Sequence, residues 1–175
     1  MVLVSQIASY FLECYQQQYG EIMDEDKLQK VLYFVQREAI IRKGKPMFDA
    51  EFRARLYGPV ILEIHEKYKT DDLHDIPSLE SISQWKECIE YVFEEFVPKN
   101  TTSLISLIHA ERSWQRARVG YGKYDKSDVP MKLSDIYDDA EYRRMRRESL
   151  PLRHAMQNFY QQHPEVFHIP VVHNI

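Results

Sequence analysis

The chain has 175 residues, of which 44% are hydrophobic and 29% are charged, and its formal net charge is -4 at pH 7. This length and composition predict one soluble globular domain over residues 1–175, with a core that needs no disulfide or metal. The negative charge disfavours broad binding to nucleic acid, and no apolar run approaches the ~20 residues that a membrane span requires. Cys14 and Cys88 lie in apolar patterns without a CxxC pair, which indicates reduced thiols in a cytoplasmic protein.

The N-terminal part of the sequence predicts two helices. Apolar residues recur at helical spacing from Val4 to about Gln18, and Gly20 is a natural stop. A second helix begins at Asp24 or Asp26, because a carboxylate suits the exposed amides of a helix start, and it ends at Gly44. Its predicted buried stripe consists of Leu28, Val31, Leu32, Val35 and Ala39.

The middle of the sequence predicts an irregular connection and two further helices. Residues 47–57 are short of periodicity and hold at most a small strand. The Gly58-Pro59 pair predicts the start of a helix that runs to Tyr68, because glycine suits a cap and proline a first turn. Ser81, with a glutamine three residues later, has the spacing of a capping box and predicts a helix that reaches Phe96.

The C-terminal part predicts three helices and a tail. One is capped by Asn100, Thr101 or Thr102 and leads towards Trp114, a second follows Ser134, and a third follows Ser149 with Pro151 in its first turn. The third helix is predicted to face inward with Leu152, Ala155, Met156, Phe159 and Tyr160. The segment after Pro164 reads as an extended tail. The whole chain is therefore predicted to be mainly α, a compact single-domain bundle of about six to seven helices with at most a small β element.

Known catalytic and metal-binding motifs are missing from the sequence. His163, His168 and His173 recur at intervals of five, which places them on no common helix face, and no HExxH motif is present. No activated-nucleophile motif and no phosphate-binding glycine loop occurs. The sequence therefore predicts a protein that is not an enzyme and that uses neither a metal nor a cofactor.

Arg143, Arg144, Arg146 and Arg147 form the densest basic run, and three interpretations are open. The favoured one is a solvated helix face, in which the arginines pair with acidic residues at 138–141. The second is contact with a protein partner, since arginine forms paired hydrogen bonds with carboxylates. The third is contact with nucleic acid phosphates, which the negative net charge makes the weakest.

Two aromatic residues are also open to two interpretations. Trp114 follows an apolar helix and fits a core position, and Tyr57 precedes the Gly58-Pro59 pair and fits a structural turn. Either aromatic also suits recognition of a partner. We therefore keep Tyr57, Trp114 and Arg118, together with the four arginines above, as candidate partner-binding residues.

Three motifs in a fixed order carry a family resemblance. The first is Lys27-Leu28-Gln29-Lys30-Val31-Leu32-Tyr33-Phe34 with the turn Gly44 to Phe48, and the second is Tyr57-Gly58-Pro59-Val60. The third pairs a histidine and a tryptophan, which here are Ile108-His109 and Ser113-Trp114 followed by Ala117-Arg118. This series resembles the Panacea domain family of SocA-like antitoxins and phage-associated bacterial proteins. The resemblance covers about residues 26–142, and residues 143–175 lie outside it.

The resemblance implies a function in recognition, without bond chemistry. It implies a mainly helical antitoxin-like protein that neutralises a toxin encoded nearby, either by binding alone or as an adaptor to a ClpXP-type protease. An alternative from another class is a phage or prophage interaction module that regulates without a toxin. Because residues 143–175 lie outside the motifs, we expect them to contribute to partner selectivity.

Overall fold

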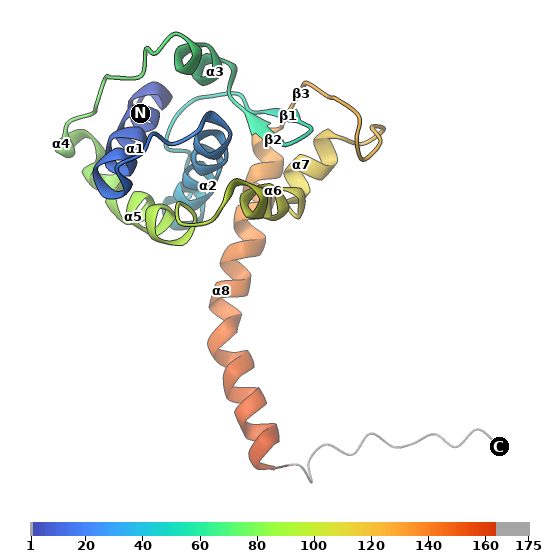
Figure 1. The fold of residues 1–175 in the computed structure, drawn as a ribbon. Coiled ribbons are helices and arrows are strands. Elements are labelled where there is room, and N and C mark those ends of the chain that lie inside the picture. The colour runs from blue at the N-terminus through green and yellow to red at the C-terminus, as the bar shows by residue number, and fades with distance from the viewer. Residues whose placement is uncertain (1, 164–175) are drawn as a thin grey trace. The chain divides into compact units, whose positions relative to one another are not determined.

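The computed structural model describes residues 2–163. The chain forms two units, Met1–Glu141 and Tyr142–Ile175. Helices dominate the first unit, as predicted, and a three-stranded antiparallel sheet with the order β2-β1-β3 completes it (Figure 1). The elements are α1 (Val4–Tyr19), α2 (Glu25–Lys43), β1 (Arg53–Arg55), β2 (Gly58–Val60), α3 (Leu62–Lys69), α4 (Leu79–Ile82), a 3-10 turn (Ser83–Trp85), α5 (Lys86–Glu95), α6 (Thr101–His109), α7 (Arg112–Ala117), β3 (Val129–Pro130) and α8 (Leu133–Gln162).

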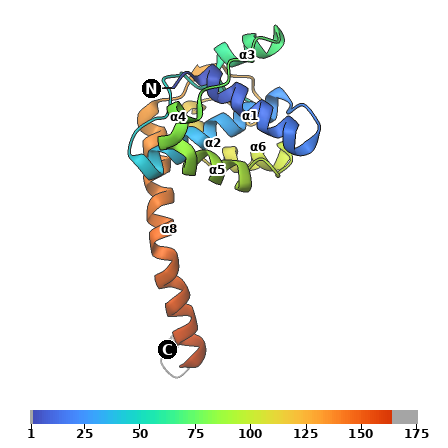
Figure 2. The ribbon, with the colours of Figure 1, turned by 90° about the vertical axis from the view of Figure 1, so that its left-hand side faces the viewer.

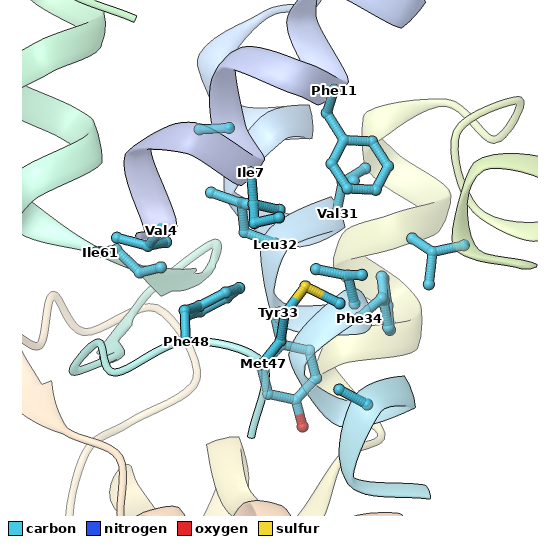
Figure 3. Close-up of a cluster of buried hydrophobic side chains, with 14 of the residues drawn as sticks. Val4, Ile7, Phe11, Val31, Leu32, Tyr33, Phe34, Met47, Phe48 and Ile61 are labelled. Atoms are coloured by element: carbon cyan, nitrogen blue, oxygen red, sulfur yellow. The ribbon is translucent and has the colours of Figure 1, made fainter. Parts of the chain in front are cut away.

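Helix α2 lies at the centre of the first unit, with α1, α5 and α6 around it (Figures 1 and 2). Asp24 caps its start by accepting a hydrogen bond from the Lys27 amide at 2.8 Å, and Gly44 ends it at a φ of 68°. Both ends agree with the sequence prediction. Every residue from Lys27 to Ile40 is buried, so the predicted single apolar stripe was too narrow. Figure 3 shows Val31, Leu32, Tyr33 and Phe34 of this helix among side chains of α1 and of the chain after α2.

The buried polar residues of α2 bind the segments that pack on it. The Gln29 amide oxygen accepts from the Ile61 amide at 2.9 Å, and its nitrogen donates to the Ile61 carbonyl at 3.3 Å. Gln36 holds Met47 and Phe48 in the same way, at 2.8 Å to the Met47 amide and 2.8 Å to the Phe48 carbonyl. A buried backbone group must find a hydrogen-bond partner. These two glutamines therefore replace the water that the packed segments lose on burial.

Buried charges on α2 are also paired. Arg37 donates to Glu111 at 2.6 Å, with both side chains almost fully enclosed, and Arg42 donates to the buried Glu38 at 2.6 Å. The Lys27 ammonium donates to the Val97 carbonyl at 3.1 Å. Such pairs offset the large cost of removing a charge from water, which explains how a fully buried helix keeps them.

Two helix starts differ from the prediction. Gly58 and Pro59 lie in β2, and α3 begins later at Leu62. The proline is tolerated there because β2 is an edge strand, where a missing amide leaves no central ladder bond unmade. The predicted helix from Ser81 to Phe96 is divided, because Ser78 caps α4 and a 3-10 turn separates α4 from α5.

The C-terminal helices also differ from the prediction. One helix, α8, replaces the two expected after Ser134 and Ser149, and Pro151 lies inside it. Strong helix formers on both sides of the proline continue the helix past the hydrogen bond that it cannot make. Leu152, Ala155, Met156 and Phe159 were expected to face inward, yet all are exposed. The predicted tail after Pro164 and the side chain of Tyr160 lie outside the described residues.

We predict that Gln36→Leu lowers the free energy of unfolding by about 1 to 3 kcal/mol, because it leaves the Met47 amide and the Phe48 carbonyl buried without partners. Gln17→Leu is the matched control, since this glutamine is exposed on α1. Urea unfolding of both variants measures the difference. Equal midpoints for the two variants would show that Gln36 does not stabilise the 47–48 segment.

Candidate functional site

The tight turn between β1 and β2 presents an exposed tyrosine. Arg55 pairs with Gly58 across the strands, so Leu56 and Tyr57 form a two-residue turn. The Tyr57 side chain is 61% exposed at the tip, whereas Gly58 has a φ of 112°, a conformation that favours glycine. The hairpin therefore holds an aromatic ring in solvent on a backbone with a special geometry.

Two residues of the third motif hold this turn through hydrogen bonds to its backbone carbonyls. The His109 ring nitrogen Nε2 lies 3.1 Å from the Leu56 carbonyl, and the Trp114 indole donates to the Arg55 carbonyl at 3.0 Å. The two rings stack on each other with their centres 4.1 Å apart. A carbonyl oxygen can only accept a hydrogen bond, so the His109 ring donates to it from a protonated Nε2. Trp114 is buried, which agrees with its interpretation as a core residue.

Arg118 closes the same region through Ser127. Its guanidinium donates to the Ser127 hydroxyl, to the Gly122 carbonyl at 3.1 Å and to the Asp125 carbonyl at 2.9 Å. Ser127 in turn donates to the Ala54 carbonyl of β1 at 2.6 Å. Arg118 is 6% exposed, so it holds the loop before β3 against the hairpin and has little surface to offer a partner.

The first motif reaches the turn through Lys30. A Cβ atom at Gly58 would lie 3.2 Å from Lys30 Cε and 3.3 Å from Ile108 Cγ2, so the backbone of the turn packs directly on both side chains. The Lys30 ammonium lies 3.2 Å from Asp26 Oδ1. Burial lowers the pKa of Lys30, and the Asp26 carboxylate opposes that shift. All three motifs therefore meet at one hairpin.

A cleft of about 640 Å³ lies beside Tyr57. Charges of both signs line it, and two ion pairs define its walls: Arg55 with Asp128 at 2.9 Å, and His65 with Glu25 at 2.6 Å. The lining residues are Asp24, Glu25, Asp26, Lys30, Arg55, Leu56, Tyr57, Gly58, Val60, His65, Lys126, Ser127 and Asp128. This arrangement suits recognition of a polar chain segment, which finds both donors and acceptors beside an aromatic anchor.

Residues 2–163 contain neither a metal site nor a membrane-spanning helix. No group of three or more histidine, cysteine, aspartate or glutamate side chains there is placed to hold a metal ion. None of the helices in this part of the chain combines the length and apolar content that a membrane crossing needs.

The candidate residues named from sequence fall into two sets. Tyr57, Trp114 and Arg118 come together at the hairpin, although only Tyr57 is exposed. Arg143, Arg144, Arg146 and Arg147 lie on α8 in the second unit. Sequence reasoning did not assign a role at this site to Lys30, Arg55 and Asp128. Lys30 is part of the first motif, and its place within an otherwise apolar pattern was the available signal.

Two of the acidic residues proposed as partners for the arginine run contact residues outside it. Asp138 binds Arg116 at 2.5 Å. Asp139 is buried and accepts from the Arg112 and Ser113 amides, both at 2.9 Å, so it caps the start of α7. Within the run, Arg144 lies 3.9 Å from Glu148 of the same helix. The interpretation of the run as a solvated helix face stays a prediction.

Comparison with known proteins gives one match. The family model described as "Antitoxin SocA-like, Panacea domain" matches residues 28–115, which is half of the chain. This range holds Lys30, the Tyr57 turn, His109 and Trp114, and so contains most of the hairpin site. No curated protein and no solved structure matches the chain.

We predict that Gly58→Ala lowers the free energy of unfolding by at least about 2 kcal/mol, because it combines an unfavourable φ with crowding against Lys30 and Ile108. Gly44→Ala is the control: its φ of 68° is also positive, but no atom lies within 4 Å of the added carbon. We expect that variant to lose about 1 kcal/mol. Urea unfolding decides, and equal losses would mean that the turn does not pack closely on Lys30.

We predict that His109 makes folding sensitive to mild acid. Burial lowers the pKa of His109, so below about pH 6.5 the unfolded chain binds a proton more readily than the folded one. Stability from this group is present above that pH and is lost as the pH falls through the lowered pKa. His109→Gln keeps an N–H donor for Leu56 and removes the titration. We expect the free energy of unfolding to fall more between pH 7.5 and pH 5.5 in the unmodified protein than in the variant. An equal fall in both proteins would contradict the assignment.

Proposed function

We propose that this chain, which belongs to the family of SocA-like antitoxins with a Panacea domain, binds and neutralises a protein toxin encoded nearby, with the Tyr57 turn as its main contact. One observation supports this location of the toxin contact. The three motifs that characterise the family converge on a single hairpin, and the side chain that this hairpin leaves most exposed is Tyr57.

Tyr57 has the properties of an interface anchor. Tyrosine is enriched at binding hot spots because it buries a large ring and keeps a hydroxyl for a hydrogen bond. His109 and Trp114 hold the carbonyls of the two residues before Tyr57, Leu56 and Arg55, so little conformational freedom is lost when a partner binds. An exposed aromatic residue on a rigid turn therefore binds a partner more tightly than an equally exposed aromatic residue on a mobile loop.

The cleft beside Tyr57 defines the chemistry of the segment that binds there. Lys126, the Arg55–Asp128 pair, Glu25 and His65 all line it. A toxin segment with both acidic and basic side chains can exchange partners with these partly exposed groups. Exposed ion pairs are screened by salt, so we expect toxin association to slow as the salt concentration rises.

Binding leads to neutralisation by one of two routes. The chain blocks the toxin by occupancy, or it also delivers the toxin to a ClpXP-type protease as an adaptor. Neither route requires catalysis by this chain, so we propose that it is not an enzyme. Toxin levels during coexpression separate the routes, because only delivery shortens the lifetime of the toxin.

A second candidate function is that of a phage or prophage interaction module without a toxin. The same hairpin then recognises a regulatory or structural protein. Coexpression of the chain with each neighbouring gene product distinguishes the candidates, since only a toxin stops growth when it is expressed alone. A locus without any toxic neighbour, and without a neighbour retained by the tagged chain, contradicts the antitoxin proposal.

We predict that Tyr57→Ala weakens toxin binding by at least about 30-fold and abolishes rescue of growth, while the thermal midpoint stays unchanged because the side chain is exposed. Tyr19→Ala is the matched control, since Tyr19 is also an exposed tyrosine but lies at the end of α1 outside the matched range. Titration calorimetry and growth assays measure both effects. If the two variants bind alike, the Tyr57 turn is not the interface.

A further inference from the structure

The part of α8 in the second unit carries an exposed apolar stripe. Its side chains are Tyr142, Met145, Leu152, Met156 and Phe159, which are 39%, 51%, 64%, 47% and 48% exposed. Together with Ser149 and His163, they follow alternating steps of three and four residues along the helix. This is the a/d spacing of a coiled coil, sustained for three heptads.

Among the described residues, this part of the helix buries few of its own side chains. From Leu150 to Phe159, each described side chain is exposed. Helices in proteins depend mainly on the packing of an apolar face, because intrinsic propensity alone leaves even a good sequence marginal in water. An apolar stripe of this length therefore needs a partner helix to stabilise it.

Charges beside the stripe identify that partner. In the same heptad numbering, Glu141 and Glu148 occupy g positions, and Arg146 and Arg153 occupy e positions. In a parallel pair, each g residue faces the e residue five positions later on the other helix. Glu141 then meets Arg146 and Glu148 meets Arg153 of a second copy, so the helix is complementary to itself. The Glu148 side chain lies 3.9 Å from Arg144 of its own helix and is 70% exposed, so it can still reach a second helix.

The same charges disfavour the antiparallel arrangement. There g faces g and e faces e, which would bring the two glutamates together and the two arginines together. Pro151 falls at position c, away from the a/d seam, so its ring does not interrupt the contact surface. Ser149 and His163 place polar groups at a positions, where such residues fix the register of a seam.

We propose that residues 142–162 of α8, with His163 directly after them, form a parallel two-stranded coiled coil with a second copy of this chain. The proposal concerns self-association and does not depend on the antitoxin function. It also changes the interpretation of the arginine run. Arg146 lies at an e position and contacts the second copy, whereas Arg143, Arg144 and Arg147 lie at positions b, c and f on the outer face.

Sedimentation equilibrium of the full chain tests the proposal. We expect a concentration-dependent mass that approaches twice that of the monomer. R146E should raise the dissociation constant of the dimer at least about tenfold, because it turns a self-complementary charge pair into repulsion. R147E is the matched control at the outer f position and should change it less than about threefold. L152D should abolish the dimer.

Disulfide crosslinking tests the orientation in a background where Cys14 is replaced by serine, since Cys88 is buried. In a parallel pair, M145C lies opposite the same position of the second copy and crosslinks with itself on oxidation. In an antiparallel pair each d position faces an a position, so M145C is joined to M156C instead, and only in a mixture of the two variants. That pattern would overturn the parallel arrangement.

Two further outcomes would overturn the proposal as a whole. One is a chain that stays monomeric at about 100 µM, far above the range in which stable coiled coils associate. The other is a monomer for which L152D eliminates toxin binding, because the stripe is then a docking face for the toxin. Thermal unfolding of each variant confirms that the first unit remains folded, so a change in mass reports on the seam alone.

Discussion

The fold depends on the complete burial of helix α2. A helix enclosed on every side normally contains only apolar residues, but α2 carries Lys27, Gln29, Lys30, Gln36, Arg37 and Glu38 within its buried stretch. Lys27, Gln29, Gln36 and Arg37 bind segments outside α2, whereas Lys30 and Glu38 pair within the helix, with Asp26 and Arg42. The polar residues therefore specify which segments pack on α2 and in which register, because a misplaced segment would leave a buried group without a partner.

This constraint links the core to the proposed interface. Gln29 holds the chain at Ile61, directly after β2, and Lys30 packs one residue further along α2 against Gly58. His109 and Trp114 hold the other side of the same hairpin. The hairpin is short, and a two-stranded hairpin alone is marginally stable in water. Its fixed geometry thus comes from α2 and the α6–α7 region, which leaves Tyr57 free to serve recognition.

Local patterns in the sequence predicted much of this architecture. The caps at Asp24, Gly44 and Asn100 mark helix ends that are confirmed in the structure. The burial of the polar residues of α2 was not predictable from periodicity, since it depends on partners that are up to 106 residues away, as for Tyr33 and Asp139. The prediction of a helix start at Gly58-Pro59 was wrong, because a Gly-Pro pair looks the same in sequence at a helix start and in an edge strand.

The candidate site was predicted in part. The motif residues Tyr57, Trp114 and Arg118 were named together, but sequence could not separate the exposed tyrosine from the two residues that support it. On α8, the apolar residues after Pro151 were correctly seen as one helical stripe and wrongly assigned to the core. A heptad seam and a core-facing stripe share their spacing, and only the exposure of Leu152 and Met156 distinguishes them.

Site-specific photocrosslinking tests most directly the central claim that the family motifs build one hairpin for partner recognition. A photoreactive phenylalanine analogue replaces Tyr57 in one preparation and Tyr19 in another, and each is irradiated with the toxin and analysed by mass spectrometry. The account predicts a strong crosslink from position 57 to a single toxin segment and none from position 19. A crosslink from position 19 with none from position 57 would contradict it.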